Sequence, residues 1–199
     1  EPFSTIDLFK QMAQEGKLGI RLYVMVRESN ARLAENLAKY KTIGYADNHV
    51  TLRTIKVTLD GAIGSRGAWF LEPYSDSPGH TGLNTTPVAI AREAARLAIA
   101  NGYQLAIHAI GDRANREVLD MYEEAFKANP DKKDLRWRDE HSQHLNPADI
   151  VRFGKLGVIA AMQGIHCTSD APYVLARLGP KRAEEGGYVW QKLMKTGAV

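Results

Sequence analysis

The sequence predicts an α/β protein whose strands pair in parallel. Helix-like and strand-like segments alternate along the 199 residues, which is typical of crossover units. Hydrophobic residues make up 44% of the chain and charged residues 25%, as in an ordinary globular domain with a buried core. The spacing of the strands fits either an open doubly wound sheet or part of an eight-stranded barrel.

The first part of the chain contains two of the five expected strands. Both are short runs rich in branched apolar residues, which suits buried strands. The first helix should begin at Ser4, with Asp7 at the capping-box position. In order, we expect a helix over 4–15, a strand over 18–26, a helix over 28–40 and a strand over 50–59.

The second part repeats this alternation with clearer boundary signals. Proline at helix starts and glycine at helix ends mark two of the helices, and the Asp112 side chain can cap another. We expect a helix from Thr86-Pro87 to Gly102, a strand over 104–109, a helix capped by Asp112 and ending before Pro130, a strand over 135–140, a helix from Asn146-Pro147 to Gly157, a strand over 158–163 and a helix over 187–196.

One irregular segment is long, residues 60–85, and it is rich in Gly, Ser and Pro. A loop of this length inside a compact domain is usually functional. It follows the C-terminal end of a strand, where α/β folds place their sites.

Polar residues stand at the exits of four consecutive strands: Lys56, His108, His141, and Gln163 with His166. In a barrel the strand ends converge on one site. Histidines from separate strands, with a lysine nearby, can hold a borderline metal such as zinc. The pattern therefore predicts a metal site.

Each of these residues also has a simpler interpretation. A single histidine after a strand is usually a hydrogen-bonded structural residue, and Lys56 could be a surface lysine on an edge strand. Their equivalent positions make the functional interpretation the better one. The segment 61–66 resembles a phosphate loop only weakly, because it lacks the Gly-Lys-Ser/Thr ending.

Composition argues against several classes of protein. The net charge is +3 and no basic cluster occurs, so we expect no nucleic-acid partner. No long uncharged apolar run occurs, so we expect no membrane span. The single Cys167 cannot form an internal disulfide, which favours a cytoplasmic location.

Five ordered blocks carry a family resemblance. They are Ile55–Arg66, Leu71–Asp76, His108–Asn115, Glu140–Gln143, and Gly157–Gln163 with His166, Ser169 and Asp170. On these residues the chain resembles the YtcJ-like branch of the amidohydrolase superfamily, which includes N-substituted formamide deformylases. The resemblance covers essentially the whole chain. Asp139 and Ser142 stand where that family usually has apolar or small residues.

The resemblance implies a (β/α)8 TIM barrel with a metal centre at its C-terminal face. Residues 1–199 would form a single partial barrel domain, roughly strands 3 to 7, truncated at both ends. Lys56 then matches the fourth strand, His108 the fifth and His141 the sixth, and the lysine at the fourth-strand position often carries a carbamate in that superfamily. The family's His-x-His pair from the first strand has no counterpart in this sequence, and its Asp from the eighth strand would lie beyond residue 199.

The resemblance also implies a function. We expect a metal-dependent hydrolase that cleaves C–N bonds other than peptide bonds in a small amide, formamide or cyclic amide. One or two divalent metal ions, zinc in the first instance, would activate the water. The expected catalytic residues are Lys56, His108, His141 and His166, the first three also binding metal, and the expected substrate contacts are Asp60, Ser65, Arg66 and Gln163.

Two other functions remain open at this stage. One is an α/β enzyme that binds a phosphorylated ligand at residues 60–66, and the other is a non-catalytic remnant of the fold. We also expect the chain to be inactive alone, because half the ligand set is absent. Exposed sheet edges could then pair in a homodimer.

Overall fold

A single mostly parallel sheet organises the computed structural model, which describes residues 1–198. The parallel strands lie in chain order, β1 (Leu22–Val26), β3 (Val50–Thr58), β4 (Gln104–Ala109), β5 (Arg138–His141) and β6 (Ile159–Ala161). A short strand, β2 (Thr42–Gly44), pairs antiparallel with β3. A doubly wound sheet reverses its strand order at a switch point. The order here does not reverse, and it is the order found in part of a (β/α)8 barrel.

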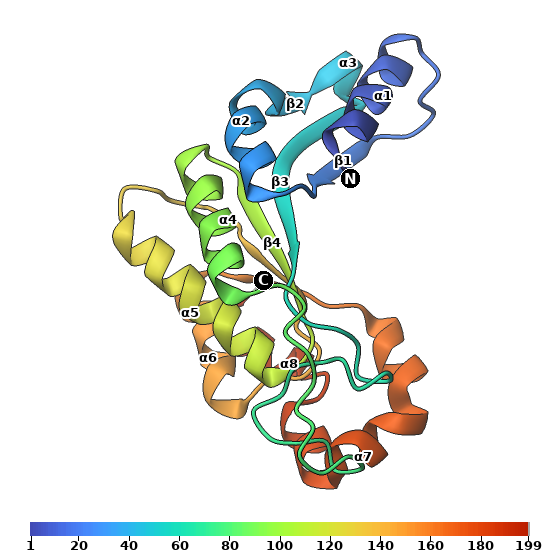
Figure 1. Ribbon diagram of the computed structural model, residues 1–199, viewed down its shortest axis with the longest axis vertical. Helices are drawn as coiled ribbons and strands as arrows, with labels where there is room; N and C mark the ends of the chain where they lie inside the picture. The colour runs from blue at the N-terminus through green and yellow to red at the C-terminus, as the bar shows by residue number, and fades with distance from the viewer. Residues whose placement is uncertain (199) are drawn as a thin grey trace.

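The helices cover the sheet in the same order. Neighbouring pairs α2–α4, α4–α5, α5–α6 and α6–α8 are in contact, and α4, α5 and α6 lie side by side along one side of the sheet (Figure 1). Their bounds are α1 Phe3–Gln14, α2 Asn30–Tyr40, α3 Tyr45–Asn48, α4 Val88–Ala100, α5 Asp112–Ala128, α6 Pro147–Leu156, α7 Gly164–Gly186 and α8 Trp190–Met194.

The main core lies between the sheet and these helices. Trp137 is its largest fully buried side chain, and its ring centroid lies 4.9 Å from that of Tyr122 and 5.2 Å from that of Phe126. The indole N–H donates to the carbonyl oxygen of Tyr103 at 3.1 Å. This bond satisfies the one polar atom of a side chain that is otherwise apolar.

A second, smaller core lies beyond the C-terminal ends of the strands. It joins the long loop 60–85 to α7, and both gather at that end of the molecule (Figure 1). Its buried members are Ile63, Ala68, Phe70, Tyr74, Ile110, Val174 and Leu178. The loop is therefore packed against α7 over the strand ends, and residues 60–85 are called the cap below.

Two predicted helix caps, at Ser4 and at Asp112, are wrong. Pro2, not Ser4, is the N-cap of α1, and no side chain caps that helix. Asp112 is the first residue of α5, where its Oδ1 accepts from the amide of Leu71 at 2.8 Å, so it ties the loop to the helix. The predicted helix start at Asn146-Pro147 is confirmed, and the side chain of Asn146 caps the helix by accepting from the amide of Ala148 at 3.0 Å.

The helix α7 was not predicted. Pro172 and Pro180 lie within it, and Gly179 breaks its helical geometry with a φ of 76°. Because proline and glycine disfavour the interior of a helix, the sequence pattern does not predict α7. Within residues 1–198, no helix has the combination of length and apolar character that crossing a membrane requires.

Candidate functional site

Three histidine rings meet at the C-terminal end of the sheet. His108 is near the end of β4 and His141 ends the neighbouring parallel strand β5. Their ring centroids are 4.5 Å apart, edge to face. His166, in the first turn of α7, stacks on His141 with a centroid distance of 5.2 Å. The structure thus brings together three of the predicted catalytic residues.

The ring of His108 has a buried nitrogen without a hydrogen-bond partner. This atom is Nε2, and the nearest acidic atom is Oδ1 of Asp60 at 3.5 Å. Burial lowers the pKa of His108 to about 3, so the ring is neutral and forms no ion pair with that carboxyl. A buried polar atom without a partner is costly, and at a strand end it indicates a ligand position.

His141 has an unusual backbone. Its φ is 83° and that of Ser142 is 41°, which for residues with a Cβ is the disfavoured left-handed region. Strain of this kind collects at functional sites. The Nδ1 atom lies 2.7 Å from Oε1 of Gln163, and burial lowers the pKa of the ring.

Lys56 lies on β3 and pairs in register with Ala106, two residues before His108, so Lys56 and His108 emerge on the same face of the sheet. Its Nζ donates to the carbonyl oxygen of Val57 at 2.8 Å. Burial lowers the pKa of Lys56 to about 8, against the opposing charge of Glu140. A substantial fraction of neutral amine is therefore present near pH 8.

Glu140 is a site residue that the sequence analysis did not single out. It pairs in register with His108, so the two side chains emerge on the same face of the sheet. It is buried and bound to Arg138. The alternation of Arg138 and Glu140 along β5 is the signal that could have identified it, because residues two apart share a face.

Asp60 is close to His108 but is engaged in holding the backbone. Its Oδ2 accepts from the amides of Trp69 and Gly111, both at 2.9 Å, and its Oδ1 accepts from the amide of Ile110 at 3.0 Å. Burial raises the pKa of Asp60 to about 7, although these three donors favour the ionised form. Both oxygens thus join the loop to the β4–α5 turn.

Ser65 and Arg66 make their hydrogen bonds within the long loop. Ser65 is exposed and its hydroxyl donates to Ala62 at 3.3 Å. Arg66 binds Asp76 through two bonds of 3.0 and 2.9 Å, and Asp76 also binds Arg177 of α7. The predicted substrate contacts of this loop are therefore engaged in its own structure.

The same loop lacks the helix that a phosphate site uses. Phosphate loops lead directly into a helix, whose N-terminal amides face the phosphate. Here the next helix begins only at Val88, so the phosphorylated-ligand alternative loses its support.

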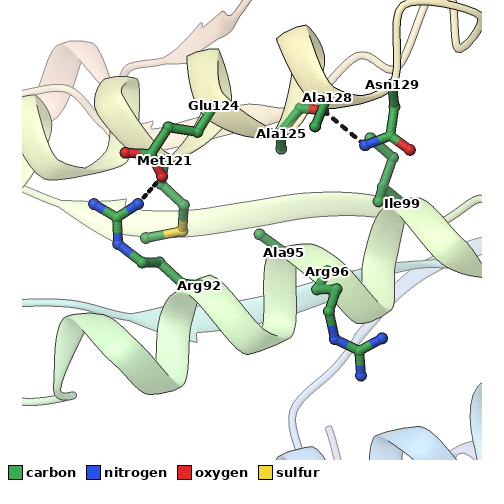
Figure 2. A pocket seen from close by; sticks show the side chains of 9 residues that line it. All are labelled: Arg92, Ala95, Arg96, Ile99, Met121, Glu124, Ala125, Ala128 and Asn129. Atoms are coloured by element: carbon green, nitrogen blue, oxygen red, sulfur yellow. Dashed lines mark hydrogen bonds and ion pairs between the residues drawn. The ribbon is translucent and has the colours of Figure 1, made fainter.

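A groove on the outer helices is separate from the histidines. Figure 2 shows its walls on α4 and α5, where Arg92 and Glu124 form an ion pair across it. The apolar lining consists of Ala95, Ile99, Met121, Ala125 and Ala128. No predicted site residue lines this groove.

The residues that could hold a metal form at most part of a ligand set. Within residues 1–198, no three His, Cys, Asp or Glu side chains are arranged to hold a metal ion. The donor chemistry of what is present still fits, because a buried neutral imidazole with a partnerless nitrogen adjoins a second imidazole. His108 and His141 therefore fit as two of the ligands that a divalent metal needs.

Comparison with known sequences decides the family. Residues 3–199 match the sequence profile of the Amidohydrolase family. The chain belongs to this family. Among related proteins, "Protein LONG AFTER FAR-RED 3" of Arabidopsis thaliana is 41% identical over 145 residues, which are 73% of this chain and 25% of that protein. "Putative amidohydrolase YtcJ" of Bacillus subtilis (strain 168) is 29% identical over 191 residues, 96% of this chain and 34% of that protein.

Two solved structures resemble this amidohydrolase family chain. Both are described as uncharacterized metal-dependent hydrolases, one from Pyrococcus furiosus and one from Pyrococcus horikoshii OT3. Each gives a TM-score of 0.81 over 96% of this chain, with 25% and 26% sequence identity, and the match spans 38% and 37% of those chains. The chain thus spans between a quarter and two fifths of the length of these relatives.

Proposed function

We propose that this chain supplies part of the catalytic barrel of a metal-dependent hydrolase that cleaves C–N bonds other than peptide bonds. The substrate would be a small amide, formamide or cyclic amide, as the family resemblance implies. One observation carries the proposal, the buried partnerless Nε2 of His108 beside the ring of His141. Membership of the Amidohydrolase family and two metal-dependent hydrolase neighbours support it.

In this proposal His108 and His141 are metal ligands, and zinc is the metal of choice. Lys56 is the third ligand, because a neutral amine can add carbon dioxide to form a carbamate with loss of a proton. A divalent ion in such a site would supply a water of pKa ~7 and would polarise a carbonyl group. His166, which stacks beside His141, would donate a hydrogen bond to the substrate's carbonyl oxygen.

Zinc binding by the chain itself tests the proposal. Titration calorimetry should give weak binding for the unchanged chain and at least roughly a tenfold weaker affinity for His108→Ala and for His141→Ala. His49→Ala is the matched control, because His49 is half-buried and bonds the carbonyl oxygen of Ala46 at the start of β3, away from the strand exits. Equal zinc affinity in all four proteins would overturn the ligand assignment.

Hydrolysis is the second test. We expect no appreciable turnover of N-substituted formamides by the zinc-loaded chain alone, because two histidines and a lysine cannot both fix the ion and move a proton to the leaving nitrogen. Turnover comparable to that of a full-length relative would contradict this. Activity found only in a dimer fraction would show that two copies complete one site.

A further inference from the structure

We propose that Gln163 is a positioning residue that fixes the tautomer and the orientation of His141, so that Nε2 of His141 is the nitrogen left free for a ligand. The inference rests on the proposed function only where it names a metal as that ligand. Its geometric part stands on two hydrogen bonds and a strained backbone.

The first step fixes the amide of Gln163. Its Nε2 lies 2.7 Å from the carbonyl oxygen of Ala161, which can only accept. The amide NH₂ must therefore point at Ala161. The opposite flip would set two oxygens against each other, so Oε1 is the atom that faces His141.

The second step fixes the proton on His141. Oε1 of Gln163 only accepts, and it lies 2.7 Å from Nδ1 of His141, so Nδ1 must carry a proton. A neutral imidazole carries one ring proton. The lone pair is then on Nε2, which is the form that a metal requires.

The third step explains why such a clamp is needed. His141 and Ser142 have φ values of 83° and 41°, so the strand no longer sets the direction of the ring in the ordinary way. Gln163 is the N-cap residue of α7 and stands two residues after β6. Its bond therefore ties the ring at the end of β5 to the end of the next strand.

The same bonds change the role expected for Gln163. Its carbonyl faces His141 and its NH₂ faces Ala161. These two bonds hold the amide in one orientation toward His141, so we assign Gln163 to the support of the ligand.

The tautomer can be read directly from ¹⁵N histidine spectra of the metal-free chain, at a pH where the rings are neutral. His141→Ala assigns the signals. We expect the Nδ1–H form in the unchanged chain and in Gln163→Glu, whose carboxylate also accepts. Gln163→Leu should shift His141 toward the Nε2–H form that free imidazole prefers. Gln143→Leu, which removes a buried amide bound to Asp170 and Tyr188, should leave the tautomer unchanged.

Zinc affinity is the second readout. Gln163→Leu should weaken zinc binding roughly 10–100-fold, with recovery in Gln163→Glu. An Nε2–H form in the unchanged chain, or an unchanged Nδ1–H form in folded Gln163→Leu, would overturn the proposal whatever zinc does. The expected tautomers without zinc binding in any protein would uphold the positioning role and refute the metal site instead.

Discussion

Removal of the Asp60 carboxylate should loosen the cap from the sheet. The side chain is almost wholly buried and accepts three backbone N–H groups, those of Trp69, Ile110 and Gly111. An unsatisfied buried N–H costs about 1–3 kcal/mol. The bonds to Ile110 and Gly111 are buried, whereas that to Trp69 is partly open to water. We therefore expect Asp60→Ala to lower the free energy of unfolding by about 3–5 kcal/mol.

Asp60→Asn separates the lost bonds from the lost volume. One amide oxygen remains as an acceptor, and the NH₂ group then faces backbone donors, so the expected loss is about 1–3 kcal/mol. Urea unfolding followed by tryptophan fluorescence measures both changes, since Trp69 adjoins the site. The control is Asp131→Ala, whose carboxylate is 72% exposed beside Lys132 and should change stability by less than about 0.5 kcal/mol. A loss in Asp60→Ala no larger than in this control would refute the reasoning.

Three further perturbations test other contacts. Gly111→Ala would place a Cβ 2.1 Å from the carbonyl oxygen of Trp69 and should lower the free energy of unfolding, measured in urea, by about 2–4 kcal/mol. Gly164→Ala has open space around it and should leave this free energy nearly unchanged. Equal losses in the two variants would contradict the close packing of the β4–α5 turn. Trp137→Phe loses a buried ring and a hydrogen bond and should cost about 1.5–3 kcal/mol, and a change below about 0.5 kcal/mol would contradict its central place. In ¹³C-bicarbonate, the carbamate signal in ¹³C NMR spectra should rise through about pH 8 as Lys56 loses its proton. The signal should vanish in Lys56→Met. An equal signal in both proteins would exclude Lys56 as its source.

Elements bounded by strong local signals were predicted well. The strand Gln104–Ala109 has the predicted bounds, because glycines flank its apolar run. The helix α6 begins after Asn146 and ends at Gly157, which takes a φ of 66°. In both cases a few neighbouring residues fix the backbone.

Elements held by distant contacts were missed. The stretch from β2 to α3 has positive φ at Ala46, Asp47 and Asn48, which no local pattern indicates. The helix α7 contains two prolines and packs on the loop cap, so its stability comes from tertiary contacts. The pairing of Arg177 with Asp76 joins residues a hundred positions apart and is equally invisible in the sequence.

The candidate site likewise has one feature that the sequence predicts and one that it does not. The meeting of His108 and His141 follows from parallel strands, whose exits share one edge, and the sequence predicts it. The bond from Gln163 to His141 depends on a strained backbone and an amide rotamer. No sequence pattern specifies a strained backbone or an amide rotamer. The sequence therefore predicts that Gln163 lies at the site, but not that it orients His141.

Asp139 offers the last prediction, and it concerns a residue that weakens the fold. In a strand, neighbouring residues face opposite sides, so Asp139 points away from the Glu140 face, and it pairs in register with Ile107. It is fully buried, and neither carboxylate oxygen has a hydrogen-bond partner. Such a group is costly, so Asp139→Val should raise the free energy of unfolding by about 1–3 kcal/mol near neutral pH.

The gain should depend on pH, and its sign follows from the pKa of Asp139. Burial raises this pKa well above the ordinary value, so the folded chain holds the proton that the unfolded chain releases above about pH 4. Stability of the unchanged chain then falls as pH rises, by up to about 1.4 kcal/mol per pH unit, and the advantage of Asp139→Val grows. Asp139→Asn, of nearly the same size but without a proton to lose, should remove the share of this slope that Asp139 contributes and leave that of Asp60, whose pKa is also raised. Urea unfolding at pH values from about 5 to 7 measures it. A slope equal in Asp139→Asn and in the unchanged chain would assign the titration to another group and refute the argument.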